Sequence, residues 1–146
     1  MMRFVLPTVL TLASAFAWAT PLTPENILGR YKVDASYMFK HAYVKIHIVN
    51  NHEFDITRYY PDGREEPTCQ GTYNFGSSAY IDDLGFLAAG KTFKGVFTCP
   101  DDRSKKYDFN IDYKNTQLED LIKGTNVSVT SSLAPGINLK AYVIRY

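Results

Sequence analysis

The chain has 146 residues, 14% of them aromatic, and a formal net charge of +1 at pH 7. This length fits one domain with a modest core, and the near-zero charge without a basic face argues against nucleic acid as a partner. Cys69 and Cys99 are the only cysteines, and in an exported protein they predict one disulfide.

The first residues have the features of a cleaved signal peptide. Arg3 precedes an apolar run that ends in Ala-Trp-Ala at residues 17–19, the small-x-small pattern of a signal-peptidase site. The run is too short and too weakly flanked to favour a membrane span. We therefore expect a leader at residues 1–19, one domain at residues 20–146, and export to the periplasm or the extracellular space.

The chain after the leader predicts one helical turn and then three strands. An N-cap, a first-turn proline and an acidic residue predict the turn at residues 23–28. Period-two alternation predicts strands that begin near Tyr31, at residue 41 and at residue 53. A three-residue loop at 50–52 aligns Ile48 with Phe54, whereas a two-residue turn would place Ile48 beside an acidic residue.

The two cysteines fix the register of the next two strands, at residues 68–75 and 92–99. Both cysteines have the inward parity of their strands. A strand between them would separate them by roughly 9 to 10 Å, more than the ~7 Å between Cα atoms that a disulfide tolerates. We therefore expect a direct antiparallel pair with Cys69 opposite Cys99, and a long loop at residues 76–90.

This register places a glycine opposite an aromatic residue twice. Gly71 then faces Phe97, and Tyr73 faces Gly95. A ring over a glycine on the neighbouring strand restores packing that the glycine lacks. The disulfide and the glycine positions thus favour the same pairing.

The rest of the chain completes a barrel. A loop at 100–104 precedes a strand with Phe109 inward, helical spacing at 116–122 stops near Gly124, and two more strands end beyond Val143. The fold expected is all-β: a single eight-stranded antiparallel up-and-down barrel with one short helix before strand seven and one disulfide. The disulfide lies at one end, and both termini, the 76–90 loop and the helix lie at the other.

The one-turn helix followed by Gly29-Arg30-Tyr31 resembles the Gly-x-Trp start of the calycins, the group of lipocalins and fatty-acid-binding proteins, with Tyr in place of Trp. In lipocalins an arginine near the end of the last strand packs over that tryptophan at the closed end. The resemblance implies the same contact between Arg145 and Tyr31, a cation–π pair. It also implies binding of a small ligand inside the barrel.

Our leading hypothesis is therefore a non-catalytic barrel that binds a small apolar or amphipathic ligand. The inward residues that would line its site are Tyr31, Ile46, Phe54, Arg58, Tyr73, Phe97, Phe109 and Val143. Arg58 would pair with an acidic ligand at the barrel mouth, or would simply extend its guanidinium into water at the rim.

Two alternatives stay open. In one, the barrel is filled and serves as a structural or protein-interaction module, with a partner at loop 76–90, where residues 84–89 are apolar for a loop. In the other, it is an eight-stranded outer-membrane barrel, although the outward positions carry many charges that lipid disfavours. We do not expect a membrane partner.

Other motifs have simpler interpretations. Residues 85–92 satisfy the formula G-x-x-x-x-G-K-[ST], but a strand rather than a helix follows the lysine, so we do not expect nucleotide binding. His41, His47 and His52 lack partners at ligand spacing, so we expect no metal. No nucleophile elbow or paired inward carboxylates occur, and we expect neither an enzyme nor a cofactor.

Overall fold

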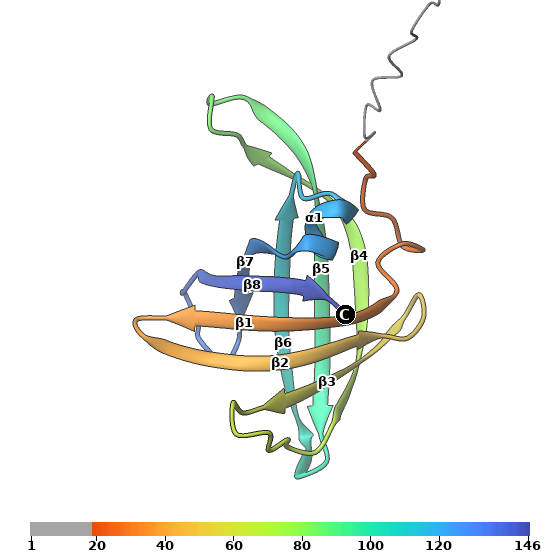
Figure 1. The fold of residues 1–146 in the computed structure, drawn as a ribbon, viewed down its shortest axis with the longest axis vertical. Coiled ribbons are helices and arrows are strands. Elements are labelled where there is room, and N and C mark those ends of the chain that lie inside the picture. Colours follow the sequence, from red (N-terminus) through yellow and green to blue (C-terminus); the bar gives the residue numbers. More distant parts are fainter. Residues whose placement is uncertain (1–18) are drawn as a thin grey trace, which may run out of the picture.

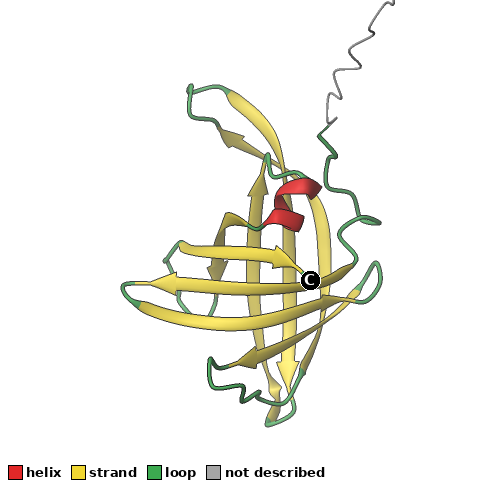
Figure 2. Cartoon of the chain, viewed as in Figure 1, coloured by secondary structure: helices red, strands yellow, loops and turns green. Residues whose placement is uncertain are grey.

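The computed structural model describes residues 19–146, and the predicted leader lies almost entirely outside the described residues. Eight strands form one closed antiparallel barrel, in which each strand pairs with its sequence neighbours and β1 pairs with β8 (Figure 1). The strands are β1 (Gly29–Tyr37), β2 (Lys40–Ile48), β3 (Glu53–Tyr59), β4 (Cys69–Ile81), β5 (Leu87–Cys99), β6 (Asp102–Lys114), β7 (Thr125–Ser131) and β8 (Leu139–Arg145). A short helix, α1 (Leu118–Lys123), lies between β6 and β7 (Figure 2). The predicted fold class is confirmed.

The strands have the predicted faces because apolar residues alternate with polar ones. Tyr31 and Val33 of β1 are buried. Ile48 of β2 lies opposite Phe54 of β3, which confirms the three-residue loop. The Asn50 side chain stabilises that loop, because its Oδ1 accepts hydrogen bonds from the backbone N–H groups of His52 and Glu53.

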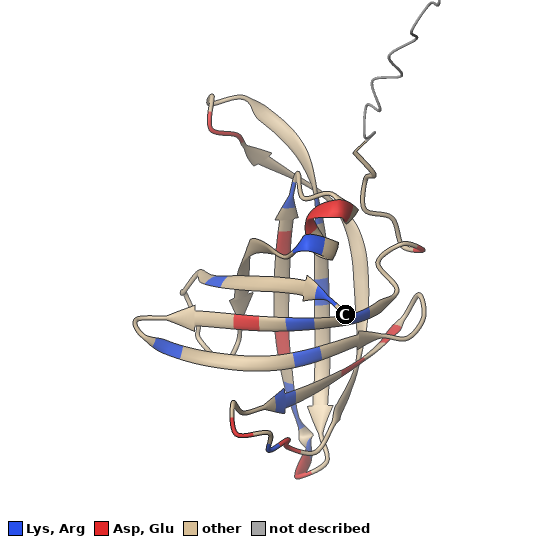
Figure 3. Ribbon diagram, viewed as in Figure 1, with Lys and Arg blue, Asp and Glu red and all other residues tan. Residues whose placement is uncertain are grey.

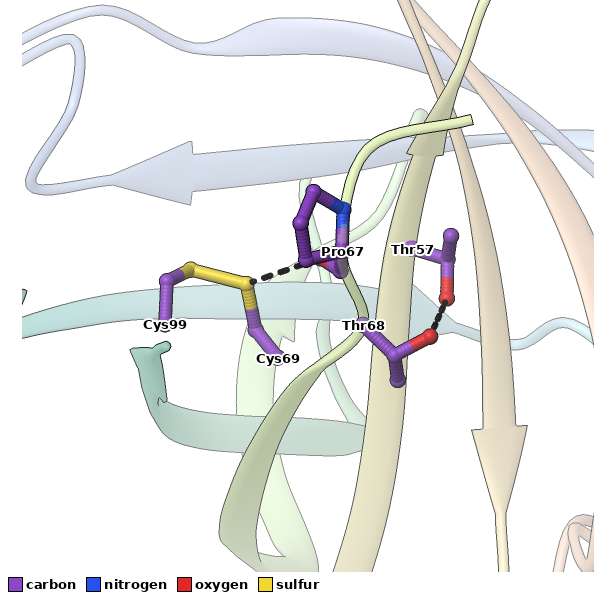
Figure 4. The surroundings of a disulfide bond; sticks show 5 residues. All are labelled: Thr57, Pro67, Thr68, Cys69 and Cys99. Carbon is purple, nitrogen blue, oxygen red and sulfur yellow. Dashed lines mark hydrogen bonds between the residues drawn. A yellow bond between two sulfur atoms is a disulfide. The ribbon is translucent and has the colours of Figure 1, made fainter. Parts of the chain in front are cut away.

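The register between β4 and β5 is also as predicted. Gly71 lies opposite Phe97, and Tyr73 lies opposite Gly95. Cys69 and Cys99 form the disulfide, with their Cα atoms 4.3 Å apart (Figure 4). Next to it, the hydroxyls of Thr57 and Thr68 lie 2.8 Å apart and connect β3 to the segment that enters β4.

The expected loop at residues 76–90 is wrong: β4 and β5 continue through most of it and are joined by a short turn at residues 82–86. Asp82 forms this turn, because its N–H donates to the Phe86 carbonyl and its Oδ1 accepts from the N–H groups of Leu84 and Phe86. Gly85 supplies the positive φ, +83°, that the turn requires. The expected loop at 100–104 is also shorter, since β6 begins at Asp102.

The rings that cover the two glycines come from other strands than predicted. A Cβ at Gly71 would lie 2.6 Å from the Phe54 ring, and one at Gly95 would lie 2.8 Å from the Phe109 ring. Phe54 faces Gly71 across the β3–β4 pair, and Phe109 faces Gly95 across the β5–β6 pair. Each glycine thus has an aromatic residue opposite it on both neighbouring strands. The ring that fills the space above the glycine comes from β3 or β6, and not from the β4–β5 hairpin.

The segment before β1 covers the end of the barrel that also holds α1. Thr23 and Asn26 cap its single turn, each side chain accepting from the other residue's backbone N–H. Leu22, Ile27 and Leu121 of α1 are completely or almost completely buried there. The N-terminal segment, α1 and the β4–β5 tip lie toward the same end, as expected (Figure 1).

The glycine packing gives a testable difference between two substitutions. Gly95→Ala should lower the free energy of unfolding by about 1 to 3 kcal/mol, because its methyl group would overlap the Phe109 and Phe54 rings. Gly76→Ala is the matched control, since no atom of residues 19–146 would lie within 4 Å of its added methyl group. Urea unfolding of both variants in dilute solution measures the difference, and equal stability losses would contradict this packing.

Candidate functional site

The interior of the barrel is filled by aromatic rings. The Phe54 ring lies at their centre, and its centroid is 5.5–6.4 Å from those of four other rings, in edge-to-face geometry. A space of about 10 Å³ remains beside Tyr31, Ile46 and Phe93, enough for one water molecule. Sites for small ligands usually have volumes of roughly 300 to 1,000 Å³.

The structure brings seven of the eight predicted lining residues together, as parts of this core. The buried residues are Tyr31, Ile46, Phe54, Tyr73, Phe97, Phe109 and Val143. The eighth, Arg58, is exposed at the rim, and its guanidinium lies 5.3 Å from the centroid of the Tyr60 ring. Binding of a ligand among these rings stays a prediction.

At the end covered by the N-terminal segment, Arg145 contacts both β1 and the turn before it. Its guanidinium lies 5.9 Å from the centroid of the Tyr31 ring and donates hydrogen bonds to the carbonyls of Asn26 and Leu28. A Cβ at Gly29 would lie 2.9 Å from this guanidinium, and Gly29 has a φ of +140°. The glycine of the Gly-x-Tyr motif therefore leaves room for the arginine.

Three buried tyrosines point toward the same region. The Tyr31 hydroxyl donates to the Ile27 carbonyl at 2.7 Å, and the Tyr73 hydroxyl donates to the Asn50 carbonyl at 2.6 Å. Burial raises the pKa of Tyr31, although Arg145 partly opposes the shift. Burial also raises the pKa of Tyr73 and, most strongly, that of Tyr113. The hydroxyls of Tyr31 and Tyr73 connect the segments before β1 and after β2 to the barrel.

The residues of the other motifs lie in the β4–β5 hairpin, in β2 and in the loop after β2. Residues 85–92 occupy the β4–β5 turn and β5, where the Lys91 ammonium donates to the Ser77 hydroxyl at 3.0 Å. His41 lies 2.8 Å from the Asp34 carboxylate, and no group of three or more metal-ligating side chains occurs within residues 19–146. In that same range, no helix has the length and apolar character needed to cross a membrane.

The outer parts of β4 and β5 form a two-stranded projection, which we call the arm (residues 76–90, green in Figure 1). The two strands pair with each other as far as Ile81 and Leu87. The β3–β4 ladder, however, ends near Tyr73, whose N–H donates to the His52 carbonyl at 2.9 Å. Within residues 19–146, no strand pairs with the other side of β4 after this bond.

The arm exposes large apolar side chains. Ile81, Leu84, Phe86 and Leu87 are each 64–81% exposed. Its charged residues are Asp82 and Asp83, both in the turn (Figure 3). The sequence indicated this apolar stretch, but not the open strand edge beside it.

No family model, curated protein or solved structure matches this chain. The eight-stranded closed barrel is compatible with a calycin-like fold. The contact of the Arg145 guanidinium with the Tyr31 ring is the one that the resemblance implies. Membership in the calycins stays a prediction.

A hollow of about 390 Å³ with a mixed polar and apolar lining lies where β6 and β7 diverge. The ladder between these strands ends at Asp112 and Ser128. Lys114, Asn126 and Lys140 are among the residues that line the hollow. It is open to solvent, and no sequence motif indicated it.

The buried tyrosines should make the free energy of unfolding decrease at alkaline pH. Their pKa values are raised in the folded chain, so the stability that they contribute is present below the unfolded-state value of about 10 and falls as the pH rises above it. Tyr113→Phe should make that decline shallower. Tyrosinate absorbance and circular dichroism, recorded together from pH 8 upward, measure both effects. Titration of all 11 tyrosines near pH 10 in a folded chain would contradict the burial.

Proposed function

We propose that this chain is an exported, non-catalytic β-barrel that binds an extended polypeptide segment along the open edge of β4. The observation that carries this proposal is the unpaired edge after Tyr73. Adding a strand to such an edge is a recurring mode of peptide recognition, in which backbone hydrogen bonds give affinity and side-chain positions give specificity.

The direction of the backbone groups follows from two hydrogen bonds. The Tyr73 N–H points toward β3, whereas the Asp82 N–H bonds within the β4–β5 turn. Because successive residues of a strand direct their backbone groups to opposite sides, the odd-numbered residues of β4 face the open edge. These residues are Phe75, Ser77, Ala79 and Ile81.

Within residues 19–146, one feature of the kind that usually protects a strand from pairing lies at the edge, the Lys91 ammonium that donates to the Ser77 hydroxyl. Proteins protect edges with lysine, proline, bulges or a covering segment. Residues 74–81 contain no charged residue and no proline, and the β4–β5 ladder has no register shift across them. An open edge beside exposed apolar side chains therefore favours strand addition.

Two observations favour this function over the other hypotheses. A ligand in the barrel would have to displace packed rings, because the remaining space is about 10 Å³. The outer wall of the barrel carries charges, among them Lys32, Lys45, Lys94 and Lys140 (Figure 3). In an outer-membrane barrel each lysine near the bilayer centre would cost about 2 to 4 kcal/mol. The small internal space and the charged outer wall together favour a barrel whose wall faces water and whose binding surface lies on the arm.

Strand addition predicts a difference between two proline variants of the arm. Ala79 and Ala89 lie opposite each other, and both are exposed. The Ala79 N–H faces the open edge of β4, whereas the Ala89 N–H faces the opposite side of the arm, so neither bonds within the ladder. Ala79→Pro should weaken binding of a labelled eight-residue peptide of alternating valine and threonine by about tenfold or more. Ala89→Pro should not.

Fluorescence anisotropy at low protein concentration measures this binding, and circular dichroism checks that both variants fold. A peptide with proline at its third and fifth positions is the control for ladder formation. If the wild-type chain does not bind the alternating peptide, or if both variants bind it equally, the proposed function is wrong.

The filled interior predicts the result of native mass spectrometry. The mature chain, purified from its export compartment without detergent, should carry no additional small molecule, because its rings occupy the axis of the barrel. A reproducible extra mass that is lost on denaturation would instead support a carrier of small ligands.

A further inference from the structure

We infer that the strand that occupies the open edge is β4 of a second copy of this chain, so that two arms form a four-stranded sheet. This inference rests on the proposed function, because it uses the same edge. It names the partner that the edge fits best. Three features support a second copy: the register that a twofold axis allows, an uncovered glycine, and the lack of charged residues at positions 74–81.

The hydrogen-bonding pattern determines the register. In an antiparallel pair, residues that exchange hydrogen bonds must both face the shared edge, so odd-numbered residues pair with odd-numbered ones. With the twofold axis at Ser78, Phe75 pairs with Ile81 of the partner subunit, and Ser77 pairs with Ala79 of the partner subunit. This arrangement uses every open position from 75 to 81 and forms about eight hydrogen bonds.

Shifting the axis by one residue loses a pair in either direction. With the axis at Ser77, Ile81 would oppose Tyr73, whose N–H already donates to the His52 carbonyl. With the axis at Ala79, Phe75 would oppose Asp83, which lies in the turn and not in β4. The length of the open edge therefore selects Ser78 as the centre.

This register also covers a glycine that the single chain leaves open. An added Cβ at Gly71, Gly90 or Gly95 would meet a ring or backbone within 2.8 Å, whereas at Gly76 no atom of residues 19–146 lies within 4 Å. In the dimer, Tyr80 of the partner subunit lies directly opposite Gly76. A ring in that position would restore the packing that glycine lacks, as Phe54 does for Gly71 in the barrel.

The charge distribution is compatible with pairing between identical strands. A twofold axis brings each residue near its own copy, so a charged edge would repel itself. Residues 74–81 are uncharged, and the first acidic residue after them, Asp82, would face Asn74 of the partner subunit. A strand of another protein could also pair with this edge. The register, the uncovered Gly76 and the uncharged residues 74–81 are the features that a symmetric pair of identical strands requires.

A single cysteine at the twofold axis tests the register. In the mature chain with its native disulfide, Ser78→Cys would place the two new thiols in a directly opposed pair, with Cα atoms about 4.5 Å apart. Oxidised glutathione should convert them to a disulfide-linked dimer, with release of two molecules of reduced glutathione. Asn74→Cys is the matched control on the same face, and its two copies would lie about 26 Å apart.

Sedimentation velocity tests the assembly without a crosslink. The wild-type chain and Ala89→Pro should show a concentration-dependent dimer, whereas Ala79→Pro should stay monomeric with an unchanged circular dichroism spectrum. Mass analysis of the Ser78→Cys dimer should find the new bond between the two Cys residues at position 78.

The outcomes separate this inference from the proposed function. A monomeric wild-type chain that binds the alternating peptide would overturn the inference and leave strand binding in place. A chain that neither self-associates nor binds the peptide would overturn both. A dimer that persists in Ala79→Pro, or that does not crosslink through Ser78→Cys, would show that the copies meet at another surface, and would also overturn the inference.

Discussion

The packing of the Phe54 ring against glycine backbone is the constraint on which the barrel interior depends. A Cβ added at Gly71 or at Gly95 would lie within 3.0 Å of the Phe54 ring, so this ring reaches the axis only because both positions lack a side chain. The rings around it then fill an eight-stranded barrel, whose interior is only wide enough for packed side chains or one small ligand. These rings occupy the axis of the barrel, which is why we propose a binding surface on the arm.

The two ends of the barrel are stabilised in different ways, and this determines where the arm can extend. The Cys69–Cys99 disulfide fixes β4 and β5 at one end. At the other, Arg145 and the Tyr31 hydroxyl bind the carbonyls of the turn that covers the barrel. The arm therefore projects from two strands whose register is fixed far from its tip. Its position relative to the barrel follows from an ordered base and not from a flexible linker.

Much of the fold could be predicted from local pattern, because alternation specifies which residues face inward and the cysteines specify one register. Residues 76–90 were expected to form a loop because the disulfide excludes a further strand between the two cysteine strands. That constraint does not limit how far the two strands extend, and they pair with each other through most of this segment. The ring that covers each glycine could not be predicted, since it depends on side-chain directions across three strands. Whether the barrel is hollow depends on its shear and on the summed volume of its inward rings. The alternation of polar and apolar residues gives no information on either.

The length of β4 and β5 is the feature that closure of the barrel does not explain. Each has 13 residues, whereas β3 and β8 have 7, and β4 needs only its first few residues to pair with β3. An isolated two-stranded ribbon is at best marginally stable in water, and three or more strands with an apolar face are needed for independent stability. The arm has that apolar face and two strands. The proposed pairing along β4 with a second copy would add two further strands to this ribbon.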